Sequence, residues 1–325
     1  MTPLAQLAVN AQSGMPLPPR WGWWVILYFF LGGLAAGSYF IATMLTAVGD
    51  RRDRDAVRLG YTLAFPLVLV CGLLLIIDLG KPLRFWHMLI QSNHVPAPMF
   101  KPWSPISVGS WGLAIFGLFA LISFIGAQVE GGRIQNPTLV RLDRWARARP
   151  RPVTLLWEVL GAFFGFFLAG YTGVLMTSST LPVWHNARLL GALFLLSAAS
   201  TSYALLLLLL TRRGRSWTDA TIAKLARADR WAIVMELVVI AAMIVLLGGL
   251  ARPIISGGFG VVFWLGVVAL GLIAPLVLHW REGSDSAAAQ RRAVLAARFV
   301  LIGGFLLRFV IVSAPQWPRV SLWHL

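Results

Sequence analysis

Eight long apolar segments constrain this chain more than any other feature of its sequence. They run over roughly residues 22–48, 59–80, 105–128, 154–177, 188–211, 231–251, 258–280 and 292–313, and each is long enough to cross a bilayer as a helix. Only 12% of the residues are charged, whereas a soluble domain has about 25%. The sequence therefore predicts an all-α integral membrane protein with eight transmembrane helices.

Basic residues gather in alternate loops. Most of the 28 Lys and Arg residues lie in the loops after the first, third, fifth and seventh segments. By the positive-inside rule these loops face the cytoplasm, which places both termini and the loop at 81–104 outside it. This orientation explains the net charge of +16, so no nucleic-acid partner is expected. Residues 1–20 lack the features of a cleavable signal peptide, and we expect them to form an extracytoplasmic N-terminal segment.

The second apolar segment ends in the stretch DLGKPLRFWH, residues 78–87. A carboxylate at the mouth of a membrane span is costly unless it is paired or hydrated. Here Asp78 is followed by two cations, an indole and an imidazole, with Arg84 and His87 among them. We interpret the stretch as a polar site at the outer end of a helical bundle. The alternative is an ordinary boundary at which long cationic side chains reach the interface.

The loop at 81–104 carries several prolines and aromatic residues. Prolines reduce the entropy that a loop loses when it packs, so we expect this loop to be ordered. It would serve either as a docking surface for an extracytoplasmic partner or as a lid packed on the bundle.

Histidines are few and lie outside the predicted membrane interior. The five are His87, His94, His185, His279 and His324. Membrane cytochromes b bind haem through histidines inside their spans, so we expect no haem in this chain. The single cysteine, Cys71, lies in an apolar segment and has no partner for a disulfide within the chain. No metal site is predicted.

Ionisable groups within the spans fall into two predicted layers. The outer layer contains Tyr28, Asp78, Tyr171 and Arg308. The inner layer contains Glu158, Glu236, Arg298 and His279. Charges inside a bilayer cost several kcal/mol of free energy unless they are paired. By position along their spans, Asp78 and Arg308 are predicted to lie at similar depth. They are therefore a candidate ion pair. The inner groups would extend a proton path to the cytoplasm, or would only anchor the helices beside the basic loops.

Small residues offer a second clue in the first span. Gly33 and Gly37 are four residues apart, which permits close helix contact or leaves room for a flat ligand. An outer pocket beside Tyr171, Thr172 and the tryptophans of the first span would suit an amphipathic ring with two carbonyls. That description fits a quinone head group.

Several stretches of the sequence resemble the NrfD/PsrC family, the membrane subunits of polysulfide-reductase-type and related respiratory complexes. The matching pieces keep the family's order over nearly the whole chain: Trp24 to Tyr39, DLGKPLRFW at 78–86, Ser107 to Trp111, Tyr171 to Leu175, and Gly303 to Arg308. Each piece alone is weak, but together with eight spans without interior histidines they are fairly specific.

The resemblance implies two four-helix bundles, residues 21–180 with the quinone site and residues 181–325 with the C-terminal tail. It implies a menaquinone or ubiquinone in the outer half of the first bundle, hydrogen-bonded by Tyr171, with Asp78 exchanging protons beside it. The predicted quinone contacts are Trp24, Tyr28, Gly33, Gly37, Asp78, Arg84, His87, Trp111, Tyr171 and Thr172. The predicted ion pair and proton path use Arg308, Glu158, Glu236 and His279.

The resemblance also implies partners on the extracytoplasmic side of a bacterial cytoplasmic membrane. These are an iron–sulfur subunit of the ferredoxin-like, four-cluster type and a molybdopterin or tungsten catalytic subunit beyond it. This chain, surrounded by membrane lipid, would pass electrons between the quinone pool and the iron–sulfur subunit. The terminal substrate would belong to another chain, and its identity stays open, as does proton translocation.

Two other classes of function compete with this interpretation. A secondary transporter or proton-conducting protein would explain eight spans with intramembrane acids, but transporters usually carry matched helix breaks in two halves. Here Pro66 and Pro275 are the only prolines well within spans, and they do not match. A purely structural anchor would explain the basic loops and the glycines but not the stretch that begins at Asp78.

Overall fold

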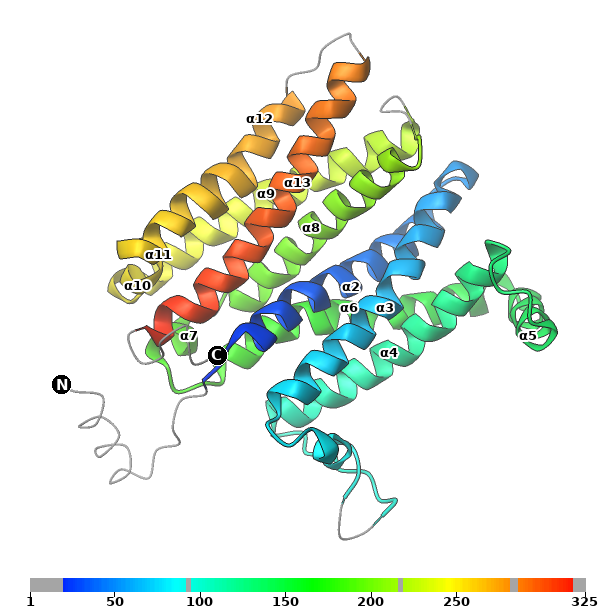
Figure 1. Cartoon of the computed structure of the whole chain (residues 1–325), viewed down its shortest axis with the longest axis horizontal. Coiled ribbons are helices and arrows are strands. Elements are labelled where there is room, and N and C mark those ends of the chain that lie inside the picture. Colours follow the sequence, from blue (N-terminus) through cyan, green and yellow to red (C-terminus); the bar gives the residue numbers. More distant parts are fainter. Residues whose placement is uncertain (1–19, 92–94, 216–218, 281–285, 318–325) are drawn as a thin grey trace.

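Figure 1 shows the computed structural model, which describes residues 20–91, 95–215, 219–280 and 286–317. In this part of the chain, eight helical segments are long and apolar enough to cross a membrane. The prediction of an all-α, eight-span membrane protein is therefore confirmed. The spanning helices are α2 (Trp23–Val48), α3 (Arg54–Asp78), α4 (Pro105–Glu130), α6 (Arg151–Thr177), α8 (Leu190–Arg212), α9 (Ala220–Leu247), the continuous α11 (Gly257–Val261), η4 (Val262–Ile273) and α12 (Ala274–Trp280), and α13 (Ser286–Ser313).

Short helices connect the spans. They are η1 (Arg51–Asp53), η2 (Pro82–Met88), α5 (Pro137–Arg147), α7 (Pro182–Asn186), η3 (Gly248–Ala251), α10 (Arg252–Ile255) and η5 (Ala314–Gln316). In the seventh span, η4 is a π-helix in line with the α-helices on either side of it. No strand occurs in the described ranges, where the only sheet-like pairing is a single bridge between Ile90 and Pro98.

Local sequence signals explain where several helices begin. Proline occupies the first turn of α4 and of α5, where the missing N–H would have no partner in any case. Ser104 caps α4 by accepting a hydrogen bond from the backbone N–H of Ser107. Asn136 caps α5 in the same manner, and Asp219 caps α9. The cap at Asp219 lets α9 begin well before the apolar segment predicted from residue 231.

Two helices lie at the centre of the molecule. α2 packs against α3, α6 and α8, and α8 packs in turn against α6, α9 and α13. We compared the most apolar stretch of each spanning helix. In α2, 83% of that stretch is buried, whereas in α4 and in α9 only 28% is buried. The remaining spans therefore surround α2 and α8 and face the lipid. The boundary between two bundles at residues 180 and 181 stays a prediction.

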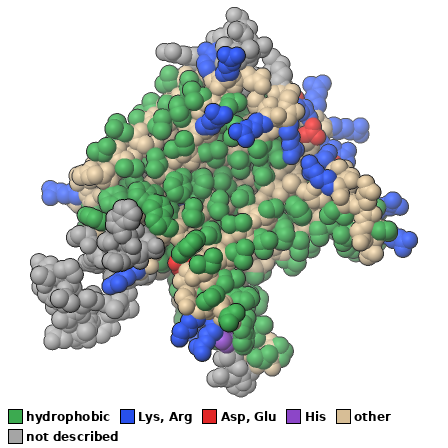
Figure 2. All heavy atoms as spheres, viewed as in Figure 1, with side chains coloured by type: hydrophobic (Ala, Val, Ile, Leu, Met, Phe, Trp, Pro, Cys, Tyr) green, Lys and Arg blue, Asp and Glu red, His purple; other side chains and the backbone are tan. Residues whose placement is uncertain are grey.

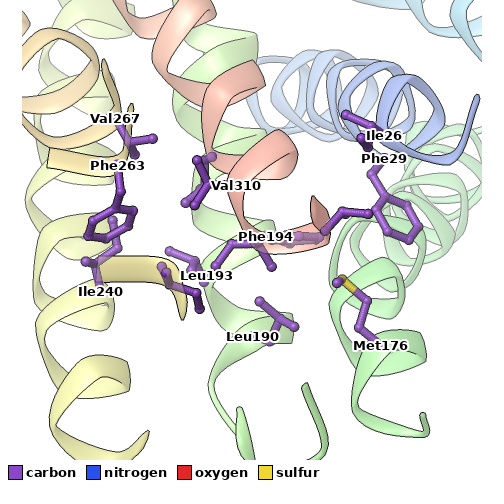
Figure 3. Close-up of a cluster of buried hydrophobic side chains, with 14 of the residues drawn as sticks. Ile26, Phe29, Met176, Leu190, Leu193, Phe194, Ile240, Phe263, Val267 and Val310 are labelled. Atoms are coloured by element: carbon purple, nitrogen blue, oxygen red, sulfur yellow. The ribbon is translucent and has the colours of Figure 1, made fainter. Parts of the chain in front are cut away.

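One large apolar cluster crosses the middle of the molecule. Figure 3 shows Phe29 of α2 and Phe194 of α8 within it, together with Val310 of α13. Its residues come from both predicted bundles. The same cluster contains Tyr28 and Cys71, so the part of α2 and α3 around these residues packs in one core with the second half of the chain.

Ion pairs join the helices at the end that carries the basic loops. Lys224 of α9 binds Asp50 and Asp53 at distances of 2.8 and 2.9 Å, and Arg215 pairs with Asp55 and Asp219. Burial alone would raise the pKa of Asp219, but its hydrogen bonds, the strongest from Arg215, lower that pKa overall. Figure 2 shows Lys and Arg side chains at the upper and right-hand edges of a broad hydrophobic surface.

Trp21 and Gln316, near the two ends of the described chain, meet at the end of the molecule opposite the basic loops. The backbone N–H of Trp21 donates to Oε1 of Gln316, and Nε2 of Gln316 donates to the carbonyl of Trp21, both at 3.0 Å. Trp21 also stacks on Trp184 of α7, with ring centroids 5.0 Å apart. The helices α2 and α13 thus start and finish at the same end of the molecule.

Candidate functional site

Tyr171 lies on α6, where that helix faces the start of α4. Its hydroxyl donates a hydrogen bond to the backbone carbonyl of Pro105, and its ring stacks on Phe167 with centroids 5.3 Å apart. Gly109 leaves the space that the phenol fills, because a Cβ at this position would overlap the ring. The hydroxyl proton is already used within the protein, so Tyr171 can offer a ligand only the lone pairs of its oxygen.

The end of the loop at 81–104 is tied to the same part of α4. Trp111 donates from Nε1 to the carbonyl of Met99 at 2.9 Å, and the backbone N–H of Lys101 donates to the hydroxyl of Ser107 at 3.0 Å. Trp111 is a predicted quinone contact, but its one N–H holds the loop instead. These contacts order residues 99–104 on the bundle, as their prolines led us to expect.

Tyr28 lies in the second turn of α2. The thiol of Cys71, on α3, donates to the backbone carbonyl of Tyr28 at 3.8 Å, and Tyr171 lies within electrostatic range of the phenol. Only 3% of the Tyr28 surface is exposed, yet its hydroxyl forms no hydrogen bond with any described residue. A hydroxyl in such a position is available to donate to, or accept from, a ligand.

Asp78 is the last residue of α3 and is exposed. No hydrogen bond or ion pair joins its carboxylate to another described residue. In η2, Arg84 is also exposed, and the ring of His87 lies against Trp86 with centroids 3.8 Å apart. These polar side chains form a rim at the end of α3 and along η2, beyond the level at which Tyr28 and Tyr171 are buried.

Two further predicted quinone contacts do not point to a ligand. Trp24, in the first turn of α2, exposes 42% of its surface. Thr172 is buried, and its hydroxyl donates to the carbonyl of Ala169 in its own helix at 3.0 Å. Among the predicted quinone contacts, Tyr28 and Tyr171 are therefore the two buried residues whose hydroxyl oxygens can still bond to a ligand.

The predicted ion pair between Asp78 and Arg308 is wrong. Arg308 is carried by α13, which packs against α8 and the seventh span, whereas α3 packs mainly against α2 and α4. The guanidinium is buried, and it donates to the hydroxyl of Ser197 and to the carbonyls of Gly304 (2.9 Å) and Phe194 (3.3 Å). Its Nε finds no acceptor in the described part of the chain.

Arg308 belongs instead to a buried polar cluster in the second half of the chain. Glu236 of α9 lies beside Ser197 and interacts electrostatically with Arg308. Asp229, which lies two helical turns earlier on the same face of α9, is beside Ser200. All five side chains are buried. The assignment of Glu236 to a separate inner layer is therefore also wrong, because it shares the surroundings of Arg308.

Gly33 and Gly37 hold the central helices together. A Cβ at Gly37 would lie 2.6 Å from the carbonyl oxygen of Ala198 and would overlap the side chain of Ser202. A Cβ at Gly33 would lie 3.2 Å from the Cβ of Ala198 and 3.4 Å from Arg308. Since α8 fills the space beside both glycines, their predicted use as a platform for a flat ligand is wrong.

Glu158 lies in a different polar cluster, inside the first half of the chain. Tyr39 and Tyr61 are within its electrostatic range, and the hydroxyl of Thr43 donates to the Glu158 carbonyl at 3.3 Å. The hydroxyl oxygens of Tyr61 and Thr43 are 3.1 Å apart, and those of Tyr39 and Ser123 are 2.9 Å apart. The two tyrosines are not among the residues singled out from the sequence.

The two acids of the predicted proton path lie on different helices. Glu158 is carried by α6 and Glu236 by α9, and each of these helices packs against α8. The path itself stays a prediction. The fourth residue of the predicted path, His279, lies on α12, and the structure does not describe its side chain. Within the described ranges, no group of three or more His, Cys, Asp or Glu side chains could hold a metal ion.

The fold and these buried groups define a multi-pass membrane protein that holds ionisable side chains within its helical interior. A protein-family model described as "Polysulphide reductase, NrfD" matches residues 11–318 of the chain. The chain therefore belongs to the NrfD family, as its sequence motifs predict.

Curated relatives match over nearly the same range. One chain of the polysulfide reductase of Wolinella succinogenes is 30% identical over 312 residues, which cover 91% of this chain and 94% of the relative. Protein NrfD of Escherichia coli is 28% identical over 319 residues, or 91% and 95% of the two chains. One subunit of the selenate reductase of Mesobacillus selenatarsenatis is 23% identical over 327 residues, or 90% and 73%.

Proposed function

We propose that this chain is the quinone-interacting membrane subunit of a respiratory oxidoreductase complex. It would exchange electrons between the quinone pool and an iron–sulfur subunit, and it would anchor that subunit to the membrane. The observation that carries the proposal is the hydroxyl of the buried residue Tyr28, which lacks a partner among the described residues and lies within electrostatic range of Tyr171. Membership of the NrfD family supports it.

The residues present fit a quinone head group. Such a group needs donors at its carbonyls, acceptors for its hydroxyls when reduced, and an apolar, mostly aromatic surround. Tyr28 has a hydroxyl free to donate, and the Tyr171 oxygen can still accept. Phe29 and Phe167 lie against these two tyrosines and exclude water from their rings.

A quinol gives up two electrons and two protons, and the protein residues must handle the protons. In our proposal, Tyr28 and Tyr171 orient the head group by hydrogen bonds and stay protonated. Asp78, Arg84 and His87 line the rim outside, where water reaches them, so Asp78 exchanges protons with the aqueous side. Trp24 and Thr172 support the packing of this end rather than the chemistry.

The two polar clusters within the spans would serve proton transfer separately. Glu236, Arg308 and Asp229 form one set of buried groups, and Glu158 with Tyr39 and Tyr61 forms the other. Groups of this kind are rare in membrane spans and mark sites of function more often than sites of anchoring. We retain His279 in the proposed path of the second half of the chain.

The proposed partners come from the names of the relatives. One relative is a polysulfide reductase chain and another is a selenate reductase subunit. By analogy, we infer a four-cluster, ferredoxin-like iron–sulfur subunit and a molybdopterin or tungsten catalytic subunit on the extracytoplasmic side of a bacterial cytoplasmic membrane. The outer end offers Leu83, Phe100 and Trp103 as exposed apolar contacts for the first of these.

Binding of a fluorescent quinol analogue tests the proposal directly. Tyr28→Phe removes only the hydroxyl, and we expect it to weaken binding to the full chain in detergent about fivefold, the contribution of one hydrogen bond. Tyr203→Phe is the matched control, since Tyr203 is also buried but lies on α8. Equal affinity of the wild type and Tyr28→Phe would refute the site.

Co-purification separates this function from transport, its competitor. A complex isolated in mild detergent should contain iron–sulfur and molybdopterin or tungsten subunits in fixed ratio with this chain. A chain that is always isolated alone, and that moves a solute across vesicle membranes, would be a transporter using the buried acids of its second half.

A further inference from the structure

The helix α5 carries two kinds of side chain on its exposed side. It connects the end of α4 to the start of α6, and Figure 1 shows it beside the end of α4. In the predicted orientation, these helix ends face the cytoplasm. Leu139, Val140 and Asp143 are partly buried, so they mark the side that faces the protein. The opposite side is divided between apolar and cationic residues, as in helices that lie in a membrane interface.

Arg147 fixes α5 at the end of the span. Its guanidinium binds the Asp143 carboxylate at 2.8 Å, the Glu130 carboxylate at 3.2 Å and the carbonyl of Gly126 at 3.0 Å. Glu130 is the last residue of α4, and it also pairs with Arg54. These contacts hold α5 at the level where a transmembrane helix leaves the hydrocarbon core.

The apolar part of the exposed side is large for a surface in water. Leu142 and Trp145 lie three residues apart on one face and expose 57% and 59% of their surfaces. The guanidinium of Arg149 lies over the Trp145 ring, with Cζ 4.0 Å from the centroid. Tryptophan next to arginine is the combination found where a protein meets lipid head groups.

The cationic part of that side is unpaired. Arg141 and Arg144, again three residues apart, are exposed and form no ion pair with any described residue. Arg147, the third arginine of the same helix, is by contrast held by two carboxylates. Two free guanidinium groups beside an exposed indole are chemically suited to phosphate esters.

We propose that α5 is an interfacial helix that binds anionic phospholipids. Trp145 and Leu142 enter the boundary of the acyl chains, and Arg141 and Arg144 bind phosphates of the surrounding head groups. The two sets of side chains are adjacent on the helix, so one orientation parallel to the membrane plane satisfies both. The proposal concerns the lipid around the subunit and does not depend on the quinone site.

A fluorophore on α5 tests the proposal in the full chain. Leu142→Cys on a Cys71→Ala background is labelled with an environment-sensitive dye and reconstituted in phosphatidylcholine nanodiscs with increasing phosphatidylglycerol. Nitroxide-labelled lipid should quench the dye, and the quenching should rise with phosphatidylglycerol content. Arg141→Gln with Arg144→Gln should raise the phosphatidylglycerol content needed for half-maximal quenching about fivefold or more.

The matched control removes two arginines from the other end of the molecule. Arg188→Gln with Arg252→Gln lowers the net charge equally at two exposed positions and should leave the quenching curve unchanged. Quenching that is absent, or that is independent of phosphatidylglycerol, would overturn the proposal. An equal shift of the quenching curve in both double variants would also overturn the proposal, because such a shift would reflect the net charge of the protein rather than α5.

Discussion

Asp78 can be replaced without disturbing the helices, because its carboxylate contacts no other described residue. We predict that Asp78→Asn lowers quinol-coupled turnover of the complex on the order of 10²-fold, the usual contribution of a general acid or base. Turnover with an artificial soluble electron donor should stay normal, since that route bypasses this subunit. Normal quinol kinetics in an assembled Asp78→Asn complex would contradict the proposed role.

Tyr171 presents a different case from Asp78. Its hydroxyl donates to the Pro105 carbonyl, so Tyr171→Phe loosens the start of α4 as well as altering the site. We predict a loss of about 1 kcal/mol in the free energy of unfolding together with lower quinol-coupled turnover. Thermal unfolding in detergent measures the first and steady-state assays measure the second. A variant of unchanged stability would show that the bond to Pro105 contributes nothing.

The charges of Glu236 and Arg308 depend on each other. We predict that Glu236→Leu destabilises the protein by about 1–3 kcal/mol, because it removes the carboxylate that lies within electrostatic range of the buried guanidinium. Glu236→Leu combined with Arg308→Met should recover most of this loss, since both charges are then removed. Thermal unfolding of the single and double variants measures the coupling. Losses that simply add would mean that the two side chains do not interact.

The contacts between these buried polar residues could not be predicted from the sequence. The polar positions Tyr28, Tyr171, Glu236 and Arg308 stand out in apolar segments, but their pairing depends on which helices touch. Depth along a span placed Arg308 beside Asp78, whereas the packing of α13 on α8 places it against Ser197 and within electrostatic range of Glu236. Depth is a one-dimensional quantity and gives no information about position around the bundle.

At the scale of elements, α2 and α8 meet so closely that one methyl group should disturb them. We predict that Gly37→Ala lowers the free energy of unfolding by about 1–3 kcal/mol, because the new Cβ would meet Ser202 and the Ala198 carbonyl. Gly72→Ala is the control: it makes the same change in a spanning helix, where no atom lies within 4 Å. Thermal unfolding should separate the two variants, and equal midpoints would contradict the close approach of α2 and α8.

A signal for the buried polar cluster was present in the fifth span. Its otherwise apolar sequence contains SAASTS at residues 197–202, and such a run of hydroxyls in a membrane helix indicates polar neighbours. In the structure Ser197, Ser200, Thr201 and Ser202 are all buried. By contrast, α5 gave no apolar run to detect, since its arginines alternate with Leu142 and Trp145.

At the scale of the whole molecule, hydropathy was sufficient to locate the eight spans. The exceptions are charged helix ends such as residues 220–230, where the cap at Asp219 extends α9 beyond the apolar segment. The membrane restricts backbone structure to hydrogen-bonded helices, so composition alone decides where they run. How those helices pack is decided by side-chain shape, which hydropathy does not report.

The orientation of the whole molecule is predicted by its charges. On a Cys71→Ala background, we expect Lys101→Cys to react with an impermeant thiol reagent added outside intact cells, and Arg144→Cys to react only after the membrane is opened. Both positions are exposed, so accessibility alone does not distinguish them. The reverse pattern would invert the orientation and leave the fold unaffected.

The burial of α2 has a consequence for biosynthesis. The helix that ends as the most enclosed of the eight is the first to leave the ribosome. Its neighbour α8 begins only at Leu190, and at ordinary rates of translation it follows on the order of ten seconds later. α3 and α6 are made before α8 and can already pack against α2. The face of α2 that carries Gly33 and Gly37 is different, because its neighbours Ala198 and Ser202 belong to α8. In the membrane this face therefore stays uncovered by its final partner until the fifth span is inserted.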